Sequence, residues 1–317
     1  MVTSDWPRTS KLVSALLDDP RSVDGGAVLL LGSGVIASAV AASLKQRGHT
    51  RIKPVAIPWE SNKRTRALRD AMSELPLIPG ARNALIWAAG RAGFSADEQS
   101  CNNELLAFKD TVDAVAMIAA EPGGTPISLH LVSSAGGLFE GLARVSVDSP
   151  VTPRRPYGYL KQRQEEMALQ MADRIPVSIY RVSSVYGCPR PGQRVGLVGE
   201  LLRNGLDRRP SAIYGAMDTL RDYVGSSEVG RHIAGGVLDL DGSASGVEMV
   251  VSGRPTAIGA VIEIVQRLLR RRLLVSFEDA WNARDITFDP AIRARGFGAE
   301  DLRVGISRSL FELLTGR

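Results

Sequence analysis

Cysteine, histidine and aromatic residues are scarce in this sequence of 317 residues. The two cysteines show no CxxC spacing, and the three histidines lie far apart in the sequence. We therefore expect neither a disulfide framework nor a zinc site, and we predict no metal ion. Aromatic residues make up 5% of the chain, which argues against nucleic acid as a partner, because such surfaces stack bases on aromatic rings.

Long hydrophobic runs are also missing. No apolar stretch approaches the roughly eighteen residues of a membrane-spanning helix, and Asp5, Asp18 and Asp19 do not fit a signal peptide. We therefore expect a cytoplasmic protein that does not associate with a membrane. A hydrophobic content of 44% with 23% charged residues is typical of a globular protein. The formal net charge is +5, and the basic residues are scattered along the chain. This positive charge slightly favours an anionic substrate.

Apolar strands and helices alternate through the first part of the chain. A strand over Ala27–Leu31 precedes a glycine turn, a helix over Ile36–Gln46 and a strand over Ile52–Ile57. The next elements are strand Ala84–Ala88, helix Leu105–Ala120, strand Ile127–Ser133, helix Tyr159–Ala172 and strand Val177–Val182. This alternation predicts an α/β fold with a doubly wound parallel sheet.

The glycine turn after the first strand has the pattern of a dinucleotide-binding turn. Residues Gly32–Ala37 read Gly-Ser-Gly-Val-Ile-Ala and fit GxGxxG/A. Gly32 permits the tight turn, Gly34 lets the backbone approach a pyrophosphate, and Ala37 allows close packing of helix on strand. The helix N-terminus supplies N–H groups for the phosphates. The residues predicted to bind NAD or NADP here are Gly32, Ser33, Gly34, Val35 and Ile36.

The segment after the second strand leaves the choice between NAD and NADP open. Glu60 suits the free ribose 2′-hydroxyl of NAD, whereas Ser61, Lys63 and Arg64 suit the 2′-phosphate of NADP. Solvated charges of an ordinary loop would give the same segment. The predicted cofactor is therefore NAD or NADP.

These patterns divide the chain into three parts. Beyond Gly187 the alternation gives way to loops rich in Pro and Gly, short helices and a basic helix over Ala257–Arg272. We predict an N-terminal helical extension in residues 1–26 and a dinucleotide-binding core in residues 27–187. Residues 188–317 are predicted to form a smaller, mainly substrate-binding C-terminal lobe, interleaved with the last strands of the core.

Tyr157 and Lys161 lie four residues apart at the start of a predicted helix, and hence on one face of it. A neighbouring ammonium and an oxidised nicotinamide ring both favour phenolate, so Tyr157 can exchange a proton with a substrate while hydride moves. Ser134 follows a strand at the carboxyl edge of the sheet and can hydrogen-bond the reacting oxygen. The alternatives are a surface tyrosine with a solvated lysine, and a serine that caps a strand end.

Together these motifs resemble the extended short-chain dehydrogenase/reductase family, the nucleotide-sugar epimerases, dehydratases and ketoreductases. The resemblance spans roughly residues 27–315. The segments that carry it are Gly32–Ala37, Ala84–Gly90, Val132–Ala135, Pro156–Lys161, Arg181–Gly187, Thr219–Val224 and Gly305–Ile306. It implies a Rossmann core, a nucleotide-sugar substrate and a homodimer.

The resemblance also implies roles for single residues. It makes Ser134, Tyr157 and Lys161 the catalytic set, with Lys161 also touching the nicotinamide ribose. Ala88 and Ala89, and with them Gly90, would lie along the cofactor.

Two further positions are implied to bind substrate. Arg221 matches an arginine that commonly meets the diphosphate of a nucleotide sugar, a role that suits a forked guanidinium. A structural pair with Asp222 is the alternative. Ser184 stands where the family's strand motif has a substrate-binding asparagine.

Some positions depart from the family's pattern. Leu31 and Ala37 stand where the first and third glycines of GxxGxxG would be, so the turn is of the GxGxxA type. The asparagine of the family's fourth helix has no clear match near Ala107–Thr111.

The residues after Ser134 narrow the reaction. The family's dehydratases have an Asp-Glu pair there, whereas Ala135 and Gly136 of this chain cannot serve as acid and base for water elimination. We therefore predict an NAD(P)-dependent oxidoreductase, an epimerase or ketoreductase with Tyr157 as acid/base. The alternatives are a reductase of a non-nucleotide carbonyl compound and a catalytically silent cofactor-binding regulator.

Overall fold

The computed structural model describes residues 26–59, 61–74, 77–78, 81–120, 126–188, 193, 196–239, 245–278 and 284–316. The predicted helical extension, apart from residue 26, lies outside the described residues, and so does Glu60. Among the described residues, no helix is both long and apolar enough to cross a membrane.

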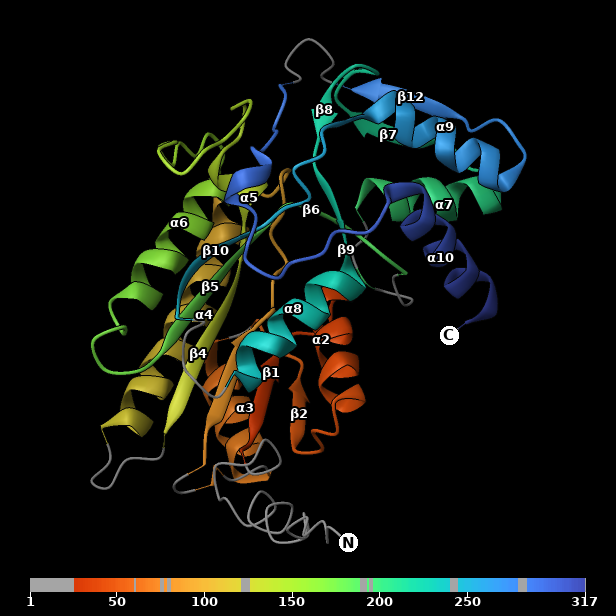
Figure 1. The fold of residues 1–317 in the computed structure, drawn as a ribbon. Helices are drawn as coiled ribbons and strands as arrows, with labels where there is room; N and C mark the ends of the chain where they lie inside the picture. The colour runs from red at the N-terminus through yellow and green to blue at the C-terminus, as the bar shows by residue number, and fades with distance from the viewer. Residues whose placement is uncertain are drawn as a thin grey trace, which may run out of the picture.

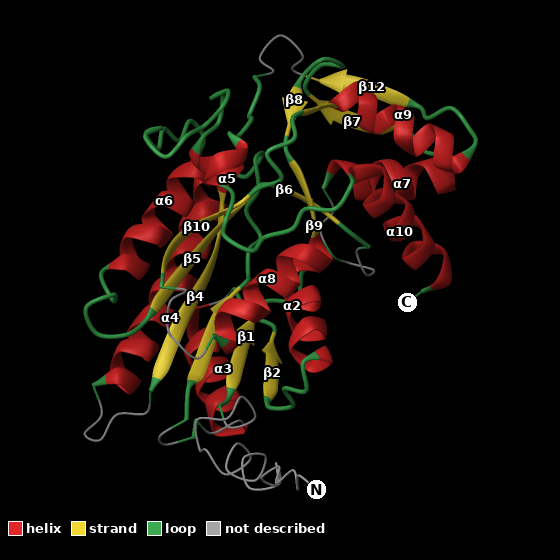
Figure 2. Ribbon diagram, viewed as in Figure 1, coloured by secondary structure: helices red, strands yellow, loops and turns green. Residues whose placement is uncertain are grey.

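Within the described residues, six parallel strands form the central sheet, in the order β10-β5-β4-β3-β1-β2 (Figures 1 and 2). These strands are β1 (Val28–Leu31), β2 (Ile52–Val55), β3 (Asn83–Trp87), β4 (Ile127–Ser134), β5 (Val177–Val182) and β10 (Gly246–Val250). Strands β1 and β3 are buried along their whole length, as continuous apolar runs predict for strands covered on both faces. The predicted doubly wound parallel sheet is confirmed, and β10 from the C-terminal part of the chain forms one edge.

Helices cover both faces of this sheet (Figure 1). They are α2 (Val35–Gln46), α3 (Ser61–Glu74), α4 (Glu98–Ala119), α6 (Pro156–Leu169) and α8 (Ser226–Leu238). The short helix α5 (Ala135–Leu138) follows β4 directly and packs in a separate hydrophobic cluster. One hydrophobic core lies between the sheet and α3, α4 and α6, and the second lies under α2 and α8. Helix α8 comes close to α2 at Gly230, where a Cβ would stand 2.5 Å from the backbone carbon of Ala39.

Several elements differ from the prediction. Helix α4 begins at Glu98 rather than at Leu105, because Asp97 caps it by accepting the Ser100 N–H at 2.7 Å. Helix α6 begins at Pro156, so Tyr157 lies in its first turn. Helices α3 and α8 were not predicted.

The C-terminal part of the chain adds a hydrophobic cluster of its own (Figure 1). Its elements are α7 (Leu197–Asp207), β7 (Ser211–Tyr214), α9 (Ile258–Leu269), β12 (Val275–Glu278) and α10 (Leu302–Thr315). Short strands lead from the sheet toward this cluster: β6 (Ser184–Tyr186), β8 (Leu220–Arg221), β9 (Tyr223–Gly225) and β11 (Thr256–Ala257). The basic helix predicted to reach Arg272 ends at Leu269, because Arg270 adopts a left-handed conformation with φ of 53°.

Candidate active site

The glycine turn lies where the order of the strands reverses. The chain goes from β1 to β2 on one side and then to β3 on the other, and ligands bind at such switch points. Gly32 has φ of +128°, and a Cβ on it would stand 2.5 Å from the Ala88 carbonyl oxygen. Gly34 caps α2, and a Cβ there would meet no described atom within 4 Å. The turn is therefore packed on one side and open at the N-terminus of α2.

The other predicted residues of this turn line its open side. Ser33 is exposed, and Val35 and Ile36 are half-buried in the first turn of α2. Gln193 Nε2 donates to the Ser33 carbonyl oxygen, and Ser38 Oγ lies 3.4 Å from the same nitrogen. Sequence reasoning did not single out Gln193, which reaches the turn from a distant part of the chain.

The residues after β3 lie beside the glycine turn. The Ala88 N–H donates to the Leu31 carbonyl oxygen at 2.9 Å, which joins the ends of β3 and β1. Ala88 is half-buried, Ala89 is buried and Gly90 is exposed. The three residues predicted to lie along a cofactor therefore border the same edge of the sheet as Gly32.

One residue proposed for a 2′-phosphate points into the protein. Arg64 is 4% exposed, its Nε lies 2.9 Å from Asp110 Oδ2, and its Nη1 donates to the Trp59 carbonyl oxygen at 2.6 Å. Lys63 is exposed, and the Arg91 guanidinium lies 5.7 Å from the centre of the Trp59 ring. Lys63 and Arg91 are therefore exposed cations, whereas the buried contacts of Arg64 stabilise the fold.

The two serines at the end of β4 have different surroundings. Ser133 is buried and donates from Oγ to Glu165 Oε1 at 2.5 Å, and Arg181 holds the same carboxylate with two nitrogens. Ser134 is half-buried and caps α5, because its Oγ accepts the Gly137 N–H at 3.1 Å. Of the two hydroxyls, that of Ser134 keeps its proton available for a further acceptor.

Two glycines bring Tyr157 next to the turn that Ser134 caps. A Cβ on Gly158 would stand 2.3 Å from the Gly137 carbonyl oxygen, and a Cβ on Gly137 would stand 3.0 Å from Tyr157 Cε1. Larger residues at either position would force α5 and α6 apart. Their absence allows the tyrosine ring to pack directly on the backbone of α5.

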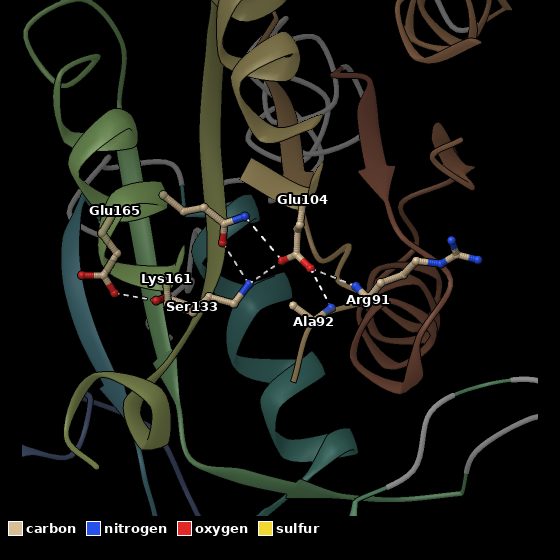
Figure 3. Close-up of polar contacts among 7 residues, drawn as sticks. Arg91, Ala92, Glu104, Ser133, Lys161 and Glu165 are labelled. Atoms are coloured by element: carbon tan, nitrogen blue, oxygen red, sulfur yellow. Dashed lines mark hydrogen bonds and ion pairs between the residues drawn. The ribbon is translucent and has the colours of Figure 1, made fainter. Parts of the chain in front are cut away.

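Lys161 lies one helical turn after Tyr157 and is 5% exposed. Its Nζ stands 3.0 Å from Glu104 Oε1 (Figure 3). The same nitrogen lies 2.9 Å from Gln164 Oε1 and 5.6 Å from the centre of the Tyr157 ring. The structure therefore brings together the three residues predicted to be catalytic, Ser134, Tyr157 and Lys161, at the carboxyl edge of the sheet.

Glu104 belongs to this site but was missed in the sequence. It lies on α4, is fully buried, and accepts the N–H groups of Arg91 and Ala92 on Oε2, each at 2.9 Å. A signal was available, because Cys101, Glu104 and Phe108 recur at helical spacing on the buried face of α4. A carboxylate on such a face requires a buried partner.

The two predicted substrate-binding residues lie on strands that lead away from the sheet. Ser184 begins β6, is exposed, and donates its N–H to the Asp222 carbonyl oxygen at 3.1 Å. Arg221 on β8 is half-buried, and its Nη1 donates to the carbonyl oxygens of Leu220, at 2.9 Å, and Arg284. Burial lowers the pKa of Arg221.

Asp222 is not the partner of the Arg221 side chain. Its carboxylate accepts hydrogen bonds from Ser183 Oγ at 2.6 Å, from both Ser252 N and Oγ, and from the Gly253 N–H at 2.7 Å. Asp222 thus ties β8 and β9 to the chain that follows β5 and β10.

Aromatic and cationic side chains border Tyr157. The Phe94 ring lies 5.7 Å from the Tyr157 ring, and the Arg155 guanidinium lies 5.9 Å from the centre of the Phe94 ring. Arg155 Nε is 2.7 Å from Glu140 Oε1, and the charges of both residues act on Arg221. Arginines at the border of a catalytic site suit an anionic substrate.

Comparison with known families decides the assignment. The sequence model of the NAD dependent epimerase/dehydratase family matches residues 28–234, more than half of the chain. The protein belongs to this family. The family resemblance inferred from the sequence motifs is therefore confirmed. The relatives of this protein in the family are NAD-dependent epimerases and dehydratases, which are enzymes.

Solved structures of similar fold cover almost the whole chain of this family member. The UDP-glucose 4-epimerase of Thermus thermophilus in complex with NAD aligns with a TM-score of 0.74 and 18% identity, over 92% of this chain and 99% of that one. MoeE5 in complex with UDP-glucuronic acid and NAD gives 0.72 and 22%, over 92% and 100%. RMD from Pseudomonas aeruginosa with NADPH gives 0.70 and 19%, over 92% and 98%. At these identities the similarity shows the fold alone, and no curated protein was found to match the sequence.

Proposed function

We propose that the protein is an NAD(P)-dependent oxidoreductase acting on a nucleotide-sugar-like substrate, as an epimerase or a ketoreductase with Tyr157 as acid/base. The observation that carries this proposal is the meeting of Ser134, Tyr157 and Lys161 beside an open glycine turn. Membership of the NAD dependent epimerase/dehydratase family supports it.

The residues of the glycine turn suit NAD or NADP. Gly34 leaves open space at the N-terminus of α2, where N–H groups without helical partners favour a pyrophosphate. Ala88, Ala89 and Gly90 would line the same cofactor, and Lys161 would reach its ribose. A bound nicotinamide supplies a site that accepts or donates hydride. Structures of similar fold that contain NAD or NADPH support this assignment.

The residues of the chain then handle the proton and the oxygen. Tyr157 exchanges its hydroxyl proton with the reacting substrate oxygen, and Ser134 donates a hydrogen bond to that oxygen. Lys161 stabilises the phenolate that Tyr157 becomes when it has given up its proton.

A nucleotide sugar is the substrate class that we propose. Arg155 at the start of α6 and Arg221, whose charges act on each other, provide forked, charged donors for a diphosphate, and Ser184 adds an exposed hydroxyl. The complexes of MoeE5 with UDP-sugars, in a protein of similar fold, support this choice.

We also propose a homodimer that pairs α4 and α6, which pack against each other in the protomer. Leu106 and Met117 on α4, and Tyr159 and Leu169 on α6, are large hydrophobic residues between 45% and 74% exposed. Leu106 and Met117 lie on one face of their helix, so a second copy can cover both. The proposed assembly therefore buries hydrophobic surface that the protomer leaves in water.

The test has two arms. Titration with NADH and NADPH, followed by nicotinamide fluorescence, is expected to show saturable binding of at least one of them. Incubation with UDP-glucose or UDP-glucuronic acid and the bound cofactor is expected to give a new nucleotide sugar on ion-exchange chromatography. Absence of binding to both cofactors would refute the proposal.

A further inference from the structure

Two consecutive arginines, Arg154 and Arg155, precede the helix that carries Tyr157. Arg155 is the N-cap of α6, but its side chain caps no backbone N–H group, and the first turn of α6 contains no acidic residue. Helix N-termini favour Ser, Thr, Asp or Asn at the N-cap and negative charge nearby. Two positive charges destabilise such a helix start, so the stability of α6 does not account for these arginines.

Glu140 holds both arginines, which we call the arginine pair. Its Oε1 lies 2.7 Å from Arg155 Nε, and its backbone carbonyl oxygen accepts the Arg154 Nε–H at 3.1 Å. Within the described residues, the side-chain hydrogen bonds of both arginines involve Nε alone. The terminal Nη nitrogens therefore keep their N–H groups for another acceptor.

The charge and exposure of the arginine pair suit a singly charged anion. Two guanidinium groups stand against the single carboxylate of Glu140, so one positive charge is left over. The Arg155 side chain is 44% exposed, so a ligand can reach it from solvent. An ion pair that is this exposed contributes little to stability, so its bond to Glu140 does not explain Arg155 either.

The arginine pair lies next to the catalytic tyrosine. The Arg155 guanidinium carbon is 5.9 Å from the centre of the Phe94 ring, which is itself 5.7 Å from the Tyr157 ring. Phe94 also packs on Gly136, where a Cβ would stand 3.5 Å from its Cζ, and it is 40% exposed. One aromatic ring thus connects Tyr157 to Arg155. A sugar ring that reaches Tyr157 can bring a substituent to Arg155 across this ring.

We propose that the arginine pair binds a carboxylate on the reacting sugar ring, so that the substrate is a nucleotide sugar acid. This inference rests on the proposed function and specifies its substrate. The diphosphate is then bound by Arg221, and Arg155 binds the sugar instead. The forked guanidinium of Arg155 matches the two charged oxygens of a carboxylate, whereas the hydroxymethyl group of a neutral sugar offers one uncharged oxygen.

Isothermal titration calorimetry with two matched ligands tests this subsite. UDP-glucuronic acid and UDP-glucose share the nucleotide and the diphosphate, and only the first has a carboxylate. The protein is first saturated with NADH or NADPH, because a reduced cofactor accepts no hydride and only binding is then measured. The wild type is expected to bind UDP-glucuronic acid about ten- to a hundredfold more tightly than UDP-glucose, as for hydrogen bonds between charged groups.

Arg155→Met separates the sugar from the diphosphate. Its affinity for UDP-glucuronic acid is expected to fall about tenfold or more, and its affinity for UDP-glucose less than about threefold, because only the first ligand loses a charged partner. Arg174→Met is the matched control. This exposed arginine follows the other end of α6, so both affinities are expected to equal those of the wild type. Circular dichroism shows whether each variant folds.

Two results would overturn the carboxylate subsite. One is a wild type that binds the two ligands equally, which decides the matter even if Arg155→Met does not fold. The other is a folded Arg155→Met variant that loses affinity for both ligands by the same factor, since Arg155 would then serve the shared diphosphate. If neither cofactor binds, or neither UDP-sugar binds the cofactor complex, it is the proposed function that is wrong.

Discussion

Single atoms decide whether the glycine turn holds a cofactor. Gly32 and Gly34 occupy the same motif, but the added Cβ would collide with Ala88 at the first position and meet open space at the second. The two glycines are therefore needed for different reasons. Gly32 is required by the fold, and Gly34 is required by the proposed ligand.

Substitution of these glycines separates the two reasons. Gly32→Ala is expected to lower the free energy of unfolding by about 2 kcal/mol or more, through its positive φ and the clash. Gly34→Ala is expected to change it by less than about 1 kcal/mol but to weaken NADH or NADPH binding at least about tenfold, because its methyl group occupies the pyrophosphate position. Chemical denaturation and fluorescence titration measure both effects. Unchanged cofactor affinity in Gly34→Ala would place the pyrophosphate elsewhere.

Tyr157 is the residue on which the proposed chemistry depends. Tyr157→Phe keeps the ring that packs on Gly137 and removes the hydroxyl, so the fold should persist while turnover falls about 10² to 10⁴-fold. Tyr214→Phe is the control, since this exposed residue lies on β7, outside both the site and the proposed dimer interface. Turnover rates on UDP-glucose or UDP-glucuronic acid provide the measurement, and an undiminished rate in Tyr157→Phe contradicts the assignment.

At the scale of elements, the contact of α5 with α6 assembles the site. Gly158→Ala would place a methyl group 2.3 Å from the Gly137 carbonyl oxygen and 2.8 Å from Pro153 Cβ. We expect a loss of about 1 to 3 kcal/mol in the free energy of unfolding, together with lower turnover as Tyr157 moves away from Ser134. Gly298→Ala, where a Cβ meets no described atom within 4 Å, should leave stability within about 0.5 kcal/mol. Equal midpoints of thermal unfolding for Gly158→Ala and Gly298→Ala would show that the contact between α5 and α6 accommodates the added methyl group.

Strands β4 and β5 carry a buried titratable group. Burial lowers the pKa of His130 to about 4, and its ring contacts Ser128 and Tyr180. Since the unfolded-state value is about 6.5, the unfolded chain binds this proton first. The stabilising contribution is thus complete above pH 6.5 and is lost as pH falls toward 4, by about 3 kcal/mol. The free energy of unfolding, measured by chemical denaturation and plotted against pH over this range, should fall less steeply for His130→Gln than for the wild type. Parallel plots for the two proteins would show that His130 does not cause the loss of stability.

At the scale of the whole molecule, the exposed hydrophobic residues of α4 and α6 predict association. Met117→Glu places a charge in the proposed interface, so the mass from static light scattering should fall from that of two chains to that of one. Val304→Glu on α10 changes another exposed hydrophobic residue, 54% exposed against 74% for Met117, on a helix outside the proposed interface and should leave the mass unchanged. A wild type that is already a single chain would end the dimer proposal.

Much of the architecture could be predicted from the sequence, because it depends on local patterns. Apolar runs of strand length, the glycine turn and the four-residue spacing of Tyr157 and Lys161 each depend on neighbours in the chain. Helix α3 was missed because its polar composition gives little apolar periodicity. The start of α4 was missed because its first turns carry polar residues and depend on the cap at Asp97.

The sequence by itself determined which side chains lie at the carboxyl ends of β1, β3 and β4, because strand ends and helix faces follow from short-range periodicity. Only the tertiary structure decided which of them meet. Glu104 and Lys161 are 57 positions apart, and their contact depends on how α4 and α6 pack against each other. The direction in which Arg64 points and the carbonyl partners of Arg221 depend equally on distant segments. Long-range packing therefore determines which side chains surround Tyr157 and Lys161.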